Sequence, residues 1–239
     1  EITVLSPYND KIDARIVAGQ ARVFAHLGVP LVQADLQGSH EEWLDREIAA
    51  CQTDVFCTAD IDAFPLTRAA YDRAIGVARS GGIFGLAQTE NRHNPDEIYA
   101  APMFFAIGIA TWEAMGRPSF KRGADRSDVG QEITRLARAQ GVEVVMEYPT
   151  AACRAAWGLA DRGMYGIGTF YGANDYFHLY QARVSPHARL VEMVADDIVA
   201  GGKLRFAAYV DLMVQQDYDR SLRGKLRNLF GLRRKLGAM

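Results

Sequence analysis

Apolar residues recur along the first part of the chain with two alternating periods. Short runs of β-branched and apolar residues, which predict strands, lie at residues 2–6, 29–34 and 55–58. Apolar positions three and four apart, which predict helices, lie between these runs at residues 12–27 and after Ser39. Ser39 and Glu42 form the pattern of a capping box at the start of the second helix. Alternation of strand and helix predicts a doubly wound α/β fold with a parallel sheet and right-handed crossovers.

The remainder of the chain is less regular. Further strands are predicted at residues 83–88 and 142–148, and a helix is predicted to begin after Thr67 as its cap. Residues 163–175 contain four glycines and several aromatics, which predicts a flexible loop. Helical periodicity returns at residues 190–200 and 204–218. The change in character after Pro186 predicts a catalytic or binding domain at 1–185 and a helical extension at 186–239.

Two carboxylates directly follow the third predicted strand. Asp60 and Asp62 are separated by one residue, and Pro65 then ends any continuation of the strand. In open α/β sheets ligands bind at the carboxyl ends of the strands. Carboxylate oxygens suit Mg²⁺ or Mn²⁺, whose coordination substrate phosphates often complete. Exposed turn acids or helix caps would give the same short pattern, although Thr67 is available as the cap of the next helix.

Two further residues are candidates for chemistry. Asp128 begins a predicted helix, where an acid also acts as a simple cap favoured by the helix dipole. His178 lies among aromatic residues, where histidine is commonly a hydrogen-bonded core residue and less often a ligand. The sequence alone leaves both alternatives open for each residue.

Composition narrows the class of protein. The chain has 239 residues, 49% of them hydrophobic and 23% charged, which is ordinary for a globular protein with a full core. A net charge of −2 gives no electrostatic argument for nucleic acid as a partner. Three cysteines without ligand spacing predict reduced thiols, and with no signal peptide visible we expect a cytoplasmic protein. The most apolar run, residues 100–112, is shorter than the roughly 20 residues that span a bilayer.

The C-terminal tail has its own charge pattern. From Arg220 to Lys235 it contains lysine, arginine and interleaved leucines but no acid. A basic amphipathic helix of this kind predicts binding to an anionic membrane surface or to an acidic partner. A solvated helix that packs on the domain through its leucines fits the same pattern.

The order of these features resembles one enzyme family. The similar segments are Val4-Leu-Ser-Pro7, Phe56-Cys-Thr-Ala-Asp-Ile-Asp62, Pro102-Met-Phe-Phe-Ala-Ile-Gly108, Thr111-Trp-Glu-Ala-Met-Gly116, Asp128-Val-Gly-Gln-Glu132 and His178-Leu-Tyr-Gln-Ala-Arg183. Together they resemble the GT-A nucleotide-diphospho-sugar glycosyltransferases, especially small bacterial members with an Asp-x-Asp motif. The resemblance covers roughly residues 2 to 185 and rests on the order and spacing of the segments. It implies a Rossmann-like, mostly parallel central sheet with helices on both faces, plus C-terminal helices.

The resemblance also implies roles for individual residues. Asp60 and Asp62 would hold Mn²⁺ or Mg²⁺ on the donor diphosphate, with His178 as a third ligand. The nucleoside pocket would be lined by residues at the ends of the first two strands, namely Pro7, Tyr8 and Asp35.

The same resemblance implies a reaction. A sugar would pass from a nucleoside-diphosphate donor to a hydroxyl of a saccharide or lipid-linked acceptor, as in hexosyltransferases. Asp128 would be the general base of an inverting reaction, with Asp125 and Glu132 as alternatives. The predicted loop at 163–175 would be a lid that excludes water.

Two other interpretations use the same residues. In haloacid dehalogenase-like phosphatases the first Asp of such a pair is a nucleophile, but that family has a small hydroxyl or β-branched residue where this chain has Phe64. It also carries the motif on its first strand rather than its third. A non-catalytic module that binds a nucleotide sugar, or a scaffold, would need no intact acid pair, base candidate and histidine.

Overall fold

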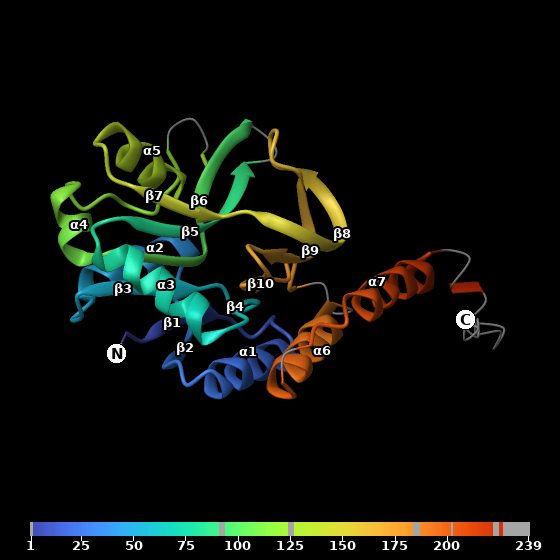
Figure 1. Ribbon diagram of the computed structural model, residues 1–239. Coiled ribbons are helices and arrows are strands. Elements are labelled where there is room, and N and C mark those ends of the chain that lie inside the picture. The colour runs from blue at the N-terminus through green and yellow to red at the C-terminus, as the bar shows by residue number, and fades with distance from the viewer. Residues whose placement is uncertain are drawn as a thin grey trace.

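Two β-sheets and their covering helices make up the fold (Figure 1). The computed structural model describes residues 2–90, 94–123, 127–183, 187–201, 203–221 and 225–226. The larger sheet has the strand order β2-β1-β3-β6-β5-β7. Its strands are β1 (Val4–Tyr8), β2 (Leu31–Asp35), β3 (Val55–Ala59), β5 (Ile83–Glu90), β6 (Asn94–Gly108) and β7 (Val144–Glu147).

The larger sheet is mostly parallel. Only β6 runs against the others, because it pairs antiparallel with both β3 and β5, while the pairs β1·β2, β1·β3 and β5·β7 are parallel. Strand β3 is buried along its whole length, and its successive side chains enter different clusters of the core. Phe56 packs with residues of one face, whereas Cys57 packs with residues of the other. The predicted α/β class is therefore confirmed.

Helices cover both faces of this sheet. They are α1 (Ala14–His26), α2 (His40–Ala50), α3 (Arg68–Arg79), α4 (Ile109–Ala114) and α5 (Gln131–Ala139). Buried side chains of α1 and α3 belong to one core cluster, and those of α2, α4 and α5 belong to the other. The predicted caps are present, since Thr67 Oγ1 accepts from Ala70 N at 3.1 Å and Ser39 Oγ accepts from Glu42 N at 3.3 Å.

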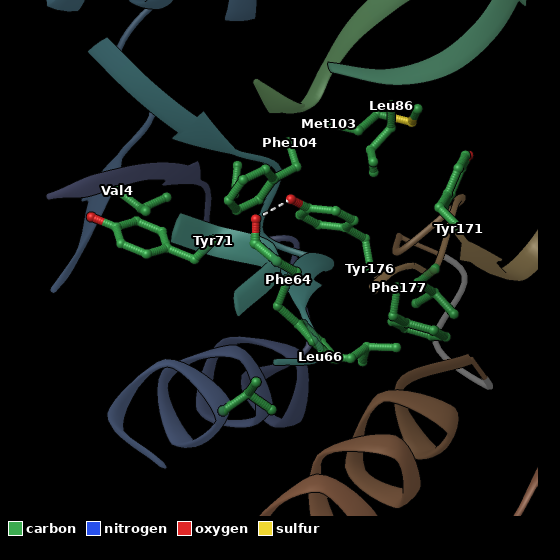
Figure 2. Packing of buried hydrophobic residues seen from close by; sticks show 14 of the residues in the cluster. Val4, Phe64, Leu66, Tyr71, Leu86, Met103, Phe104, Tyr171, Tyr176 and Phe177 are labelled. Carbon is green, nitrogen blue, oxygen red and sulfur yellow. Dashed lines mark hydrogen bonds between the residues drawn. The ribbon is translucent and has the colours of Figure 1, made fainter. Parts of the chain in front are cut away.

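A smaller antiparallel sheet packs beside the first. It contains β4 (Ala63–Pro65), β8 (Pro149–Gly158), β9 (Met164–Tyr171) and β10 (Tyr176–His178), in the order β4-β10-β9-β8. Figure 2 shows Phe64 of β4 and Tyr176 and Phe177 of β10 gathered in the core. The rings of Phe64 and Phe177 are 5.2 Å apart, and Tyr176 lies 5.0 Å from Phe104 of β6. This packing fixes the small sheet against the large one.

The prediction of a flexible loop and lid at 163–175 is wrong for most of that segment, because β9 is a buried strand. Its glycines serve close packing. A Cβ on Gly166 would lie 2.1 Å from the carbonyl oxygen of Arg154 on β8, so only glycine permits this approach of the two strands. Tyr165 and Phe170 flank it with side chains that are fully buried. Glycine content therefore misled the sequence prediction.

The C-terminal helices are α6 (Ala188–Val199) and α7 (Phe206–Arg220), close to the predicted ranges. Helix α6 packs directly on α1, where a Cβ on Gly19 would lie 2.8 Å from Val191 Cγ1. Helix α7 follows α6 along the chain (Figure 1) and contacts the small sheet, since Tyr209 stacks on Phe170 of β9 at 5.9 Å and Asp217 pairs with Arg154 of β8 at 2.5 Å. Most of the basic tail from Arg220 to Lys235 lies outside the described residues. Among the described helices, none combines the length and apolar character that crossing a bilayer requires.

Candidate metal centre and adjoining cavity

Strand pairing brings the histidine to the two carboxylates. After β3 ends, Asp60 to Asp62 form a turn, and the chain immediately enters β4. Strand β10 pairs antiparallel with β4 so that His178 is opposite Ala63. A further hydrogen bond joins Leu179 N to Asp62 O at 2.9 Å. The histidine is therefore held beside the turn by backbone contacts on both sides.

The three side chains form a compact donor group. His178 Nε2 is 3.3 Å from Asp62 Oδ1 and 3.8 Å from Asp60 Oδ2. One ligand atom from each residue lies within 4.8 Å of the other two, a spacing that could hold a metal ion. Asp62 and His178 are buried, while the Asp60 side chain is 28% exposed. Two carboxylates and one imidazole suit a divalent cation that keeps open positions for a ligand.

The electrostatics of the turn also favour a bound cation. Burial, together with the negative charges of Asp62 and Asp128, raises the pKa of Asp60 above its usual range, although His40 and His178 act in the opposite direction. Like charges gathered in a partly dry site are costly unless a positive charge is placed among them. A divalent cation would supply that charge.

Two supporting residues were not found from the sequence. Gln20 of α1 is fully buried, and its Nε2 donates to the carbonyl oxygens of Asp60 at 2.8 Å and of Ala63 at 2.9 Å. His40, the first residue of α2, places Nε2 3.5 Å from Asp60 Oδ1. A glutamine on the apolar face of a helix was the signal that could have revealed Gln20. The sequence offers no comparable signal for His40.

A cavity of about 540 Å³ opens in front of the donor group. Its wall includes Pro7 and Tyr8 at the end of β1, the turn after β3, and Gln88 of β5. The chain passes from β1 outward to β2 and then to β3 on the other side of β1, so the gap between β1 and β3 is the topological switch point of the sheet. Ligands of open α/β sheets bind at such a point.

Of the three residues predicted to line a nucleoside pocket, two line the cavity and one does not. Pro7 and Tyr8 line the cavity. Asp35 is exposed at the end of β2, is absent from the cavity wall, and accepts a hydrogen bond from Gln37 Nε2 at 2.5 Å. The structure therefore brings two of the three together with Asp60.

The candidate base Asp128 is not among the residues that line the cavity, although its side chain is 27% exposed and its Oδ1 lies 3.7 Å from an Arg122 guanidinium nitrogen. Its Oδ2 accepts from Tyr99 Oη at 3.0 Å and from Gln88 Nε2 at 3.2 Å, and its Oδ1 accepts from Val129 N at 2.9 Å. It is not the cap of α5, because that position is Gly130 in the left-handed conformation. Of the alternatives, Asp125 lies outside the described residues, and Glu132 accepts a hydrogen bond from Arg135.

The backbone after β10 is strained where it forms the cavity wall. Tyr180 has φ +57° and Gln181 has φ +56°, which is the left-handed region that ordinary residues rarely adopt. Both residues line the cavity. Strain of this kind persists where the surrounding structure holds a side chain in one required position.

Comparisons with known proteins do not assign a function to this chain. No protein-family model and no curated protein sequence matches the chain. One similar solved structure is A197 from STIV, with 13% identity, a TM-score of 0.40, and coverage of 69% of this chain and 93% of that one. Another is a putative glucose-1-phosphate thymidylyltransferase from Bacillus anthracis in complex with a sucrose, with 11% identity, a TM-score of 0.41, and coverage of 79% and 75%. Both likenesses are too low to argue an activity from.

Proposed function

We propose that this protein is a metal-dependent glycosyltransferase that moves a sugar from a nucleoside-diphosphate donor to an acceptor hydroxyl. One observation carries the proposal. Asp60, Asp62 and His178 converge at the carboxyl edge of the sheet and face a cavity at its switch point. An acid pair with a histidine in that place suits a cation that binds a diphosphate.

The metal would be held by Asp60, Asp62 and His178. An imidazole ligand favours Mn²⁺ over Mg²⁺, because Mg²⁺ prefers an all-oxygen shell with several waters. When bound, the cation supplies positive charge to a leaving nucleoside diphosphate. Gln20 would keep the turn that carries Asp60 in place for this ligation.

The rest of the cavity accommodates the donor. Pro7, Tyr8, Ile12 and Leu36 give the β1 side of the wall an apolar character that suits a nucleoside. The acceptor, a saccharide or a lipid-linked sugar, would approach from the open side of the cavity. Asp128 is the base that the resemblance implies for an inverting reaction, and its Oδ2 accepts a hydrogen bond from Gln88 Nε2 on the cavity wall.

Thermal shift with nucleoside diphosphates tests the proposal. The protein is heated with UDP, GDP, CDP or ADP, each with Mn²⁺ or with EDTA. A ligand that binds only the folded state at a hundredfold excess over its Kd adds about 2.7 kcal/mol of stability. We expect one nucleoside diphosphate to raise the midpoint, and EDTA to abolish the effect.

Matched variants connect the shift to the donor group. Asp60→Ala, Asp62→Ala and His178→Ala should each lose the manganese-dependent shift. Asp161→Ala is the control, because that carboxylate is 88% exposed on the turn between β8 and β9. An equal shift in EDTA, or an unchanged shift in all three site variants, would show that the metal assignment is wrong.

A further inference from the structure

A chain of hydrogen-bonded side chains ends at Gln88 on the cavity wall. Tyr171 Oη and Tyr180 Oη are 2.8 Å apart, and Tyr180 Oη donates to Gln88 Oε1 at 3.4 Å. On its other side Gln88 Nε2 donates to Asp128 Oδ2, which also accepts from Tyr99 Oη. The amide of Gln88 is thus held from both ends.

The chemistry of the partners fixes which way this amide faces. A carboxylate only accepts hydrogen bonds, so the nitrogen of Gln88 must face Asp128 and the oxygen must face Tyr180. A tyrosine hydroxyl carries one proton at neutral pH, so Tyr180 donates its proton to Gln88 and accepts one from Tyr171. All hydrogen bonds in the chain then run in one direction toward Asp128, and the Gln88 amide cannot flip without breaking two of them.

Part of the hydrogen-bonding capacity of Gln88 remains for a ligand. A primary amide has two N–H donors and two acceptor lone pairs, and the chain uses one of each. Within the part of the protein that the structure describes, no other side chain or backbone group bonds to this amide. Gln88 lines the same cavity as Asp60 and His178, and the His178 ring lies 3.9 Å from the Tyr180 ring. One oriented donor and one oriented acceptor therefore adjoin the metal centre.

The strand order indicates which part of a donor would reach this amide. The candidate metal centre follows β3, which is flanked by β1 on one side and by β6 on the other, with β5 beyond β6. Tyr8 on β1 and Gln88 on β5 are therefore on opposite sides of it. A donor with its nucleoside against β1 and its diphosphate at the metal centre would extend its sugar toward β5. Sugar hydroxyls both donate and accept, which matches the two groups that Gln88 offers.

We propose that Gln88 is the residue that binds the hydroxyls of the donor sugar, and that Asp128 is a positioning residue that acts through Gln88. The inference rests on the function proposed above and names the residue that recognises the transferred group. Asp128 suits the positioning role because both carboxylate oxygens accept hydrogen bonds, Oδ1 also faces Arg122 at 3.7 Å, and the residue does not line the cavity, although its side chain is 27% exposed.

The test compares two affinities in the same protein. Binding of UDP and UDP-glucose, and of GDP and GDP-mannose, is measured with Mn²⁺ by calorimetry. Gln88→Met has a similar shape but no amide, and it should weaken binding of the sugar nucleotide about tenfold, as expected for lost hydrogen bonds in a buried site. It should leave the affinity for the matching nucleoside diphosphate unchanged. If Gln88→Met does not unfold cooperatively, Gln88→Asn replaces it, since it withdraws the amide by one methylene and predicts the same split.

Variants of Asp128 separate positioning from base catalysis. Asp128→Asn keeps a carbonyl oxygen that can accept from Gln88 and Tyr99, but its NH2 group would face Val129 N in place of an acceptor, so it should weaken binding of the sugar nucleotide less than Asp128→Leu does. Asp128→Leu removes the acceptor and should reproduce the defect of Gln88→Met. A general base would give a different result, because Asp128→Asn would then lower turnover by about 10² to 10⁴ without weakening binding.

The binding results distinguish an incorrect assignment of Gln88 from an incorrect proposed function. The inference is overturned if Gln88→Met binds the sugar nucleotide as the wild type does, or if Asp128→Asn loses turnover alone. If the wild type binds neither nucleoside diphosphates nor sugar nucleotides, the proposed function itself fails. If the wild type binds both and Gln88→Met weakens both equally, the proposed function stands and the assignment of Gln88 does not.

Discussion

Replacing Gln20 with leucine should weaken metal binding at the candidate metal centre, because Gln20 supports the turn that carries the acid pair. Gln20 lies on the buried face of α1 and donates to two carbonyl oxygens, those of Asp60 and Ala63. Its own Oε1 accepts from Gln33 Nε2 at 3.0 Å. Leucine has nearly the same size, so Gln20→Leu removes these hydrogen bonds without opening a large cavity.

The size of the loss in stability depends on which hydrogen-bonding partners of Gln20 keep another partner in the variant. The carbonyl oxygen of Asp60 still accepts from Ala63 N at 2.9 Å, and Gln33 Nε2 still donates to Val17 O at 2.8 Å. The remaining cost is the loss of two hydrogen bonds to carbonyl groups, one of which keeps another donor. At about 1 to 1.5 kcal/mol each, the free energy of unfolding should fall by about 2 to 3 kcal/mol. For a chain of this length that corresponds to a Tm about 5 to 10 °C lower.

Thermal unfolding followed by circular dichroism measures the stability effect, and Mn²⁺ titration measures the effect on the site. Loss of a supporting contact typically weakens metal binding about 10- to 100-fold, and we expect the lower part of that range because Asp60 itself is unchanged. Gln37→Leu is the control, since Gln37 is exposed and its hydrogen bond to Asp35 lies outside the cavity. It should change stability by no more than about 0.5 kcal/mol. A Tm for Gln20→Leu within about 2 °C of the Gln37→Leu value would refute the assigned role of Gln20.

Two further predictions concern β9 and the tail. Gly166→Ala should cost several times more stability than Gly158→Ala in a thermal melt, because a Cβ at 166 would meet backbone atoms of β8 while a Cβ at 158 meets nothing within 4 Å. Equal effects would show that the two strands can separate freely. Truncation after Asp219 should lower binding to vesicles with anionic lipid and spare turnover of a soluble acceptor, because basic residues near such a surface contribute about 1 kcal/mol each. Unchanged sedimentation with the vesicles would favour the alternative in which the tail packs on the protein.

The local pattern of residues was sufficient for the first half of the large sheet. Strands β1 to β3 and helices α1 to α3 were predicted because period and capping are properties of neighbouring residues. Ser39 and Thr67 cap the helices that the sequence assigned to them. The place of the acid pair was predictable for the same reason, since the end of a buried strand can be located from its own residues.

The small sheet was not predictable from such patterns. Considered locally, the glycines of β9 predicted a loop. Gly166 is instead required because the backbone of β8 approaches it closely across the β8–β9 hairpin. Strand β4 is only three residues long and has no period of its own. Asp35 is the last residue of β2 and does not line the cavity, whereas the next residue, Leu36, does.

The sequence by itself determined the α/β class, the positions of the first strands and helices, and an acid pair at a strand end, the place where open α/β sheets bind their ligands. Tertiary structure decided which residues accompany that pair. His178 reaches Asp62 because β10 pairs with β4, Gln20 of α1 donates to the turn, and Gln88 on the cavity wall donates to Asp128. Contacts between residues far apart in the chain depend on how sheets pair and pack, and no periodicity within a short segment records that pairing.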